Sequence, residues 1–183
     1  MRAELSPAGR ELVSLALRMI DSIDRELAPL DRALRAFARR QRGCRALIAN
    51  LYGVGAISAT AILAELGDCR RFASSDDAVR HSGLDVTVHQ SDNKRAAGHL
   101  SHEGPELLRW ALFEAAHQSA RRSSPDHDYY LQVAGRIDHN RACLSVARKL
   151  CRRAHHILRE LGDQALAPLE SEPQDEEAMQ AAA

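Results

Sequence analysis

Apolar residues recur at steps of three and four positions through residues 8–42, a spacing that places them along one face of an α-helix. The members of this stripe are Leu12, Ala16, Met19, Ile23, Leu27, Leu30, Leu34 and Phe37. Arg, Glu and Asp flank the stripe, as in a coiled coil. Pro29 removes one backbone donor and crowds the preceding turn, so we expect a kink or two abutting helices. Packing or dimerisation is the expected role of the segment.

Helical spacing of apolar side chains continues through most of the remaining chain. The helices it predicts span residues 44–51, 57–66, 106–120, 127–135 and 142–161. Gly43 marks a predicted break, and Gly67 is placed where a left-handed glycine closes a helix. Another short helix is expected after Ser74, where Asp76 and Asp77 provide capping groups, and it should end at Gly83.

Residues 84–100 have a different composition from the predicted helices, with β-branched residues followed by polar loop formers and then by small residues. This pattern predicts a short extended piece and a loop or hairpin. Such loops on a rigid scaffold often carry functional groups.

The predicted fold is mainly α. Kinked or coiled-coil helices occupy residues 1–43, and a compact helical domain with one short extended segment follows over residues 44–162. The tail, residues 163–183, is acidic and lacks bulky apolar residues, so we expect it to be disordered.

The composition of the 183 residues agrees with a helical fold, because 45% are hydrophobic but only 4% are aromatic. A β-sandwich would require more β-branched and aromatic residues. The cysteines stand far apart and form no C-x-x-C pair, so neither a zinc knuckle nor a disulfide framework is indicated. They are Cys44, Cys69, Cys143 and Cys151. No run is apolar enough for a membrane span or a signal peptide, so a cytoplasmic protein with reduced, buried thiols is expected.

The formal net charge of zero hides an asymmetry along the chain. Residues 1–160 contain all 25 bases and 19 of the 25 acids, so they carry a charge of +6, while the remaining residues carry −6. Arginine supplies 23 of the bases and suits bidentate contact with phosphate. The body is therefore a candidate binder of polyanions, although a solvated surface of mixed charge remains an alternative.

Gly53, Val54 and Gly55 interrupt the second and third predicted helices with a turn typical of a helix-hairpin-helix motif. Glycine allows a phosphate to approach the backbone closely, and the first N–H groups of the following helix carry partial positive charge. We expect this turn to bind the phosphate backbone of DNA. A glycine turn between two packed helices that binds nothing remains the alternative.

The last predicted helix carries bases on its polar face, among them Arg148 and Lys149. A basic stripe of this kind is a candidate for contact with a phosphate backbone, and a solvated face is the alternative. His99 and His102 have a spacing that metal ligands use, but no partner cysteine or carboxylate stands at a typical distance. No metal ligands are therefore predicted.

Several blocks, in order and at consistent spacing, resemble one family. They are Leu51-Tyr-Gly-Val-Gly55, Ser58-Ala-Thr-Ala61, Leu66-Gly-Asp68, Arg71-Phe72, His81-Ser-Gly-Leu84, Gln90-Ser91, Lys94, Gly98-His-Leu-Ser101, Gly104, Leu107-Leu-Arg-Trp-Ala-Leu112, Tyr130-Leu131 and Val146-Ala-Arg-Lys-Leu150. Together they resemble the C-terminal transposase domain of the insertion sequence 110/116/902 family, over residues 46–160. The stripe through residues 8–42 is similar to the coiled-coil helices that precede that domain.

The resemblance implies DNA transposition, with a serine in the loop of Gln90-Ser91 that attacks the scissile DNA phosphate. Ser91 would then be the nucleophile, and Lys94 and Arg95 would supply positive charge to the phosphate oxygens. In the family, an N-terminal nuclease-like domain with an acidic tetrad contributes Mg²⁺, and a structured RNA guides pairing of the DNAs. The implied partners are double-stranded DNA and a guide RNA, together with a second copy of this chain or a full-length transposase bound through residues 8–42.

The chain departs from the family pattern in three respects, one of which is that Ala96-Ala97 and His102-Glu103 stand where relatives carry more bases. Asp92 follows the serine where the family usually has glycine, and it places a negative charge beside the phosphate site. No segment resembles the acidic-tetrad domain, so we expect a truncated or partial transposase that binds no cofactor alone and uses Mg²⁺ held by a domain supplied in trans. A non-catalytic nucleic-acid-binding protein and a helical oligomerisation partner of a transposase remain alternatives.

Overall fold

The computed structural model of the chain describes residues 6–87, 90–91, 94–95, 99–100 and 103–168. It is mainly helical, as the sequence predicts. The helices are α1 (Pro7–Arg40), α2 (Arg42–Asn50), α3 (Ala56–Leu66), α4 (Ser75–His81), α5 (Glu106–His117), α6 (His127–Ala134) and α7 (His139–Leu161). Short 3-10 turns are η1 (Cys69–Arg71), η2 (Gln118–Ala120) and η3 (Gly162–Ala165).

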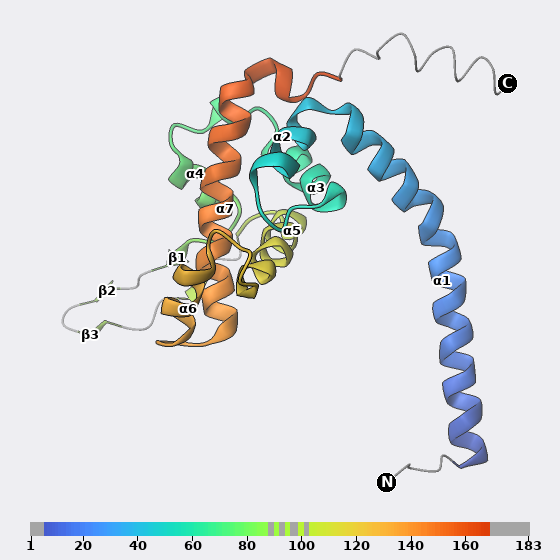
Figure 1. Cartoon of the computed structure of the whole chain (residues 1–183). Helices are drawn as coiled ribbons and strands as arrows, with labels where there is room; N and C mark the ends of the chain where they lie inside the picture. Colours follow the sequence, from blue (N-terminus) through green and yellow to red (C-terminus); the bar gives the residue numbers. More distant parts are fainter. Residues whose placement is uncertain (1–5, 88–89, 92–93, 96–98, 101–102, 169–183) are drawn as a thin grey trace, which may run out of the picture.

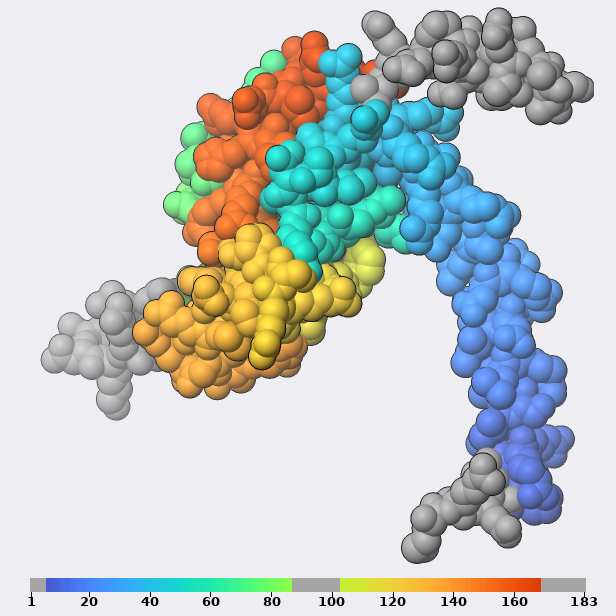
Figure 2. All heavy atoms as spheres, viewed as in Figure 1, coloured from blue at the N-terminus to red at the C-terminus, as the bar shows by residue number. Residues whose placement is uncertain are grey.

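Helix α1 forms a long arm that leaves a compact body made by the other helices (Figures 1 and 2). It runs unbroken through Pro29, so the expected pair of abutting helices does not occur, and the ribbon curves along its length (Figure 1). Ser6 caps its start by accepting a hydrogen bond from Gly9 N–H at 3.1 Å. Near its other end Ala38 is fully buried, and this end packs against α3.

Helix α7 lies at the centre of the body and contacts α2, α3, α4, α5 and α6. Leucine and alanine at helical spacing give it a wide apolar face, and small alanines allow the other helices to approach it closely. Asp138 caps α7 by accepting a hydrogen bond from Arg141 N–H at 2.8 Å. Its fully or almost fully buried residues include Val146, Leu150, Ala154 and Leu158. The four cysteines are free and buried, as predicted.

The extended segment predicted over residues 84–100 forms two nested antiparallel ladders. Strand β1 (Val86–Thr87) pairs with β4 (His99–Leu100), and β2 (Gln90–Ser91) pairs with β3 (Lys94–Arg95). Figure 1 shows β2 and β3 beyond β1, away from the helical body. The candidate nucleophile therefore lies on a hairpin outside the helical core.

Two boundaries differ from the predictions. Gly43 does not break the chain but lies buried inside α2, where an added Cβ would stand 2.6 Å from the carbonyl oxygen of Ala165. The chain breaks instead at Gln41, whose backbone is extended. The segment 163–168, predicted to be disordered, is ordered against α2: Ala165 is buried, and Pro168 forms a β-bridge with Gln41.

No helix in the described part of the chain is both long enough and apolar enough to span a lipid bilayer.

Candidate nucleic-acid interface

Gly53 lies in the turn between α2 and α3 and has a positive φ of 83°. A Cβ atom on this residue would lie 2.4 Å from the carbonyl oxygen of Ala115 in α5. Glycine is therefore required at position 53 both by the backbone conformation and by close packing on α5. The packing partner belongs to the protein, so this glycine is not free to receive a ligand on that side.

Val54 and Gly55 differ in their exposure to solvent. The Val54 side chain is buried, and its N–H donates to the carbonyl of Leu51 at 3.3 Å. Gly55 begins α3 as its N-cap, and an added Cβ there would meet no atom within 4 Å. Its own N–H donates to Ser58 Oγ at 3.0 Å. Of the three residues predicted to bind DNA in this turn, Gly55 faces the most open space.

The start of α3 has the electrostatic character that attracts an anion. The first N–H groups of a helix have no carbonyl partner within it, and together they carry about half a positive charge. In α3 these groups belong to residues 56–58. No acidic residue stands in the first turn of α3 to neutralise this charge.

Three arginines surround the start of α3. Arg35, Arg39 and Arg45 line a concavity of about 460 Å³ together with Ala56, the first residue of α3. A second concavity, of about 310 Å³, shares Arg35 and Ala56 and also includes Gly55 and, from α5, Glu114. We call the three arginines and the N-terminus of α3 the arginine face.

The arginine face is exposed to solvent. Arg39 and Arg45 lie on the surface, and within the described residues no carboxylate forms an ion pair with either. Arg35 lies 3.9 Å from Asp31 one helical turn away, with both side chains about half exposed. Such an exposed pair contributes little and leaves the guanidinium available. These arginines were not predicted as DNA-binding residues from the sequence, although the spacing of four between Arg35 and Arg39 places them on one face of α1.

The two bases predicted to bind DNA from α7 have partners within the protein. Arg148 Nε donates to the carbonyl of Leu84 at 2.6 Å, and burial lowers the pKa of this guanidinium. Lys149 Nζ lies 2.7 Å from a carboxylate oxygen of Asp126 and 4.1 Å from the centre of the Tyr129 ring. Both side chains thus join α7 to neighbouring segments, and their contact with DNA stays a prediction.

Ser91 lies on the short hairpin of β2 and β3. The backbone register pairs Ser91 with Lys94 and Gln90 with Arg95. Ser91 and Lys94 are therefore direct neighbours across the ladder. Asp92 lies outside the described residues.

The structure also brings together three residues that the sequence analysis did not group. The ligand atoms of His117, His139 and Cys143 all lie within 4.8 Å of one another. The spacing of four between His139 and Cys143 was visible in the sequence, but His117 comes from another helix. His102, considered as a metal ligand from the sequence, lies outside the described residues.

Comparison with known proteins identifies the segment that contains both the turn and the hairpin. The sequence profile described as "Transposase IS116/IS110/IS902 family" matches residues 45–132. Residues 45–132 are thus similar to transposases of the IS116/IS110/IS902 family. The matched segment includes Gly53, Gly55, Ser91 and Arg45.

Two curated relatives support this transposase assignment. A "Probable family 20 transposase" of Pseudomonas aeruginosa is 28% identical over 102 residues, which cover 56% of this chain and 30% of the relative. The "Transposase for insertion sequence element IS1111A" of Coxiella burnetii is 25% identical over 149 residues, which cover 79% of this chain and 41% of the relative. The chain therefore spans less than half the length of either transposase.

Proposed function

We propose that this chain acts in DNA transposition, in the cytoplasm, holding duplex DNA on the arginine face and attacking a DNA phosphate with Ser91. One observation carries the proposal. The segment that matches the transposase family contains both the start of α3 and the hairpin of Ser91. The role in transposition is thus inferred from the family match. The separate roles of the arginine face and of the Ser91 hairpin are inferred from their different surroundings.

The arginine face supports the binding part of the proposal. Guanidinium groups pair with phosphate oxygens in a bidentate manner, and a helix N-terminus donates backbone hydrogen bonds to the same oxygens. Gly55 leaves open space beside these donors. The pair of helices α2 and α3 would then act as a helix-hairpin-helix motif that grips the backbone without reading bases. A structured guide RNA offers the same phosphate chemistry to this face.

The chemical step proposed for Ser91 is a displacement at phosphorus. Its hydroxyl loses a proton to a base, its oxygen forms a bond to phosphorus, and one ester bond from phosphorus to a deoxyribose oxygen breaks. The departing oxygen takes up a proton, and the DNA remains joined to the serine. Lys94 and Arg95 would stabilise the negative charge that develops on the phosphate oxygens. The pairing of Ser91 with Lys94 in the ladder supports this role for Lys94.

The residues that the structure describes do not fit Mg²⁺. This ion prefers carboxylate oxygens, and the metal-ligating group that gathers among the described residues consists of two histidines and a cysteine. We therefore assign this chain no step through Mg²⁺. The ion would be held elsewhere, by a nuclease-like domain supplied in trans.

The exposed apolar residues of α1 support an assembly of several chains. Leu12 is 68% exposed and Leu30 is 60% exposed, and both lie on the stripe recognised in the sequence. Burying this stripe against a second α1 removes apolar area from water. We propose that α1 joins two copies of this chain, or this chain and a full-length transposase.

The nucleophile is tested by trapping a covalent adduct. The chain is incubated with suicide DNA substrates that carry the sequences flanking its own gene, together with Mg²⁺ and a supplied nuclease-like domain. We expect a protein–DNA adduct that survives denaturation with the wild type, and its loss with Ser91→Ala. Ser22→Ala, on the exposed surface of α1, is the matched control and should form the adduct normally.

Equal adduct yields from Ser91→Ala and the wild type would contradict the assignment of the serine. Failure of every variant to form an adduct, combined with normal DNA binding, would instead favour a non-catalytic binding protein.

A further inference from the structure

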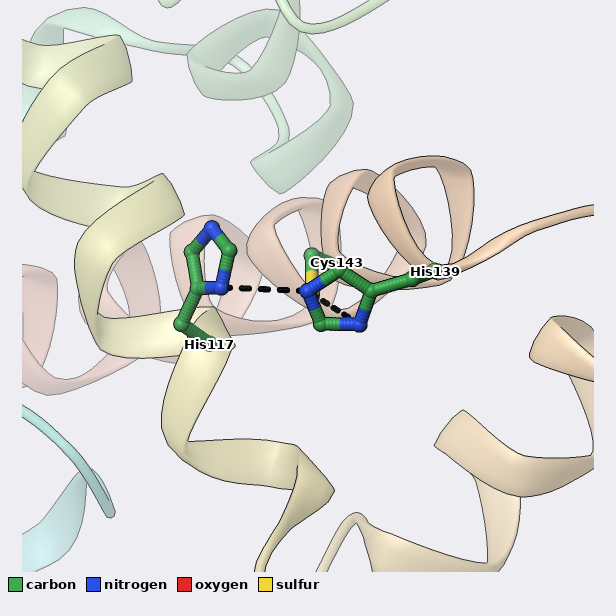
Figure 3. Close-up of side chains that lie close together, drawn as sticks. All are labelled: His117, His139 and Cys143. Carbon is green, nitrogen blue, oxygen red and sulfur yellow. Dashed lines mark hydrogen bonds between the residues drawn. The ribbon is translucent and has the colours of Figure 1, made fainter. Parts of the chain in front are cut away.

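The side chains of His117, His139 and Cys143 come from two helices and lie close together (Figure 3). His117 is the last residue of α5, His139 is the first residue of α7, and Cys143 follows one turn later in α7. His139 Nε2 lies 3.3 Å from His117 Nδ1 and 3.8 Å from Cys143 Sγ. The thiol is buried, whereas His139 is exposed, so the group lies between the core and the solvent.

These distances fit the edges of a tetrahedron around a zinc ion. Zinc binds nitrogen at about 2.0–2.1 Å and sulfur at about 2.3 Å, which implies about 3.3 Å between two nitrogens and about 3.6 Å between nitrogen and sulfur. The observed separations of 3.3 and 3.8 Å lie within a few tenths of an ångström of these values. The third separation, between the ligand atoms of His117 and Cys143, is at most 4.8 Å, and side-chain rotation would bring all three atoms to bonding distance.

A residue from a third helix orients His139. The hydroxyl of Tyr130, in α6, lies 2.7 Å from His139 Nδ1. When Nδ1–H donates to this hydroxyl, Nε2 carries the free lone pair 3.3 Å from His117 Nδ1, and Cys143 Sγ lies at 3.8 Å from Nε2 and 3.9 Å from Nδ1. A ligating histidine usually has such an outer partner, which fixes its tautomer and the orientation of its ring. The Tyr130 side chain is itself largely buried and therefore held in place.

We propose that His117, His139 and Cys143 form a zinc site with a fourth position open to water or an external ligand. Imidazole nitrogen combined with thiolate sulfur selects zinc over magnesium and calcium. Three protein ligands leave one tetrahedral position free, on the side where His139 meets the solvent. This site is independent of the proposed DNA chemistry, since it shares no residue with the arginine face or the hairpin of Ser91.

The proposed site also has a structural consequence for the turn 51–55. Zinc would join the last turn of α5 to the start of α7. The last turn of α5 contains Ala115, whose carbonyl oxygen packs on Gly53. Metal binding would therefore stiffen the surface on which the turn rests.

The test is a zinc titration of the full chain against a competing chelator, without DNA. We expect one zinc ion bound per chain. Affinity should fall in Cys143→Ser and His117→Gln by more than the roughly 10–100-fold expected for the outer-shell variant Tyr130→Phe. His156→Gln, an exposed position on α7, and Cys69→Ala, another buried thiol, are matched controls that should keep full affinity.

Cobalt provides a second readout, because a cobalt–thiolate bond gives a charge-transfer band in the near ultraviolet. The wild type should show this band and Cys143→Ser should lack it, with far-ultraviolet circular dichroism confirming that both are folded. A folded wild type that binds no zinc would overturn the proposal. Affinity that is unchanged in both His117→Gln and Tyr130→Phe would overturn it even where Cys143→Ser does not fold.

Discussion

Gly53 and Gly55 stand two positions apart but meet opposite surroundings. Gly53 packs against the carbonyl oxygen of Ala115, and Gly55 faces open space. The sequence predicts a tight turn correctly, because few other residues accept the positive φ of Gly53. It cannot tell which glycine packs on the protein and which faces a ligand, since α5 begins some fifty positions later.

Arg148 and Lys149 show the same limit for charged residues. Their helical spacing correctly places them on a polar face of α7, but their partners are remote in sequence. Arg148 reaches the carbonyl of Leu84, 64 positions away, and Lys149 reaches Asp126. The positions of basic residues along a helix therefore do not show which side chains are free to bind DNA and which pair with other parts of the protein.

His155 makes the stability of the body sensitive to pH. Its side chain is only 1% exposed, and burial lowers the pKa of the ring, with the nearby His156 and Arg159 acting in the same direction. The unfolded chain binds a proton below about pH 6.5, whereas folded His155 resists protonation. The free energy of unfolding should therefore fall as the pH decreases below about 6.5.

Replacing His155 by leucine should remove part of this pH dependence. The free energy of unfolding is measured by urea denaturation between pH 7.5 and pH 5.5, a range that brackets the ordinary histidine pKa of about 6.5. Over this range we expect the free energy of unfolding of His155→Leu to fall less steeply than that of the wild type. His156→Gln, at the exposed neighbouring position, removes only one charge that acts on His155 and should change the slope less than His155→Leu does. Equal slopes for His155→Leu and the wild type would contradict this account of His155.

At the scale of elements, the helices with strong apolar periodicity are predicted well. Helix α3 spans Ala56–Leu66 where residues 57–66 were predicted, and Gly67 closes it with a φ of 53°. The errors occur where a distant segment decides the local structure. Glycine fits at position 43 within α2 because the carbonyl of Ala165 packs against it, and Pro168 pairs with Gln41 at the start of the same helix.

Helix α1 carries a prediction about assembly. Ile23 and Leu30, which are 55% and 60% exposed, stand one heptad apart on the apolar stripe. If two α1 helices pair through this stripe, Ile23→Glu combined with Leu30→Glu should weaken the dimer by about 100-fold or more, because each burial contributes about 1.5–3 kcal/mol. Sedimentation equilibrium measures the change.

The matched control places two glutamates on the polar face of α1, as Arg25→Glu combined with Arg32→Glu. This variant should associate like the wild type at moderate salt. A wild type that sediments as a monomer, both alone and mixed with a full-length transposase, would show that α1 does not mediate assembly.

The whole molecule consists of a long arm, a compact helical body and a projecting hairpin (Figure 1). The arginine face lies where the arm meets the body, because Arg35 and Arg39 belong to α1 and Arg45 belongs to α2. Association through the arm would therefore place two arginine faces in one assembly. Under the proposed function, such an assembly would hold two DNA segments at once.

Binding of duplex DNA to the full chain, measured by fluorescence anisotropy over a range of salt concentrations, tests the arginine face most directly. Contacts from three arginines predict that log K falls with log salt with a slope of about −3. Affinity should decrease roughly tenfold or more in Gly55→Glu, which places a carboxylate beside the phosphate, and should be retained in Gly55→Ser. Binding that is independent of salt, or equal affinity in Gly55→Glu and Gly55→Ser, would contradict the account.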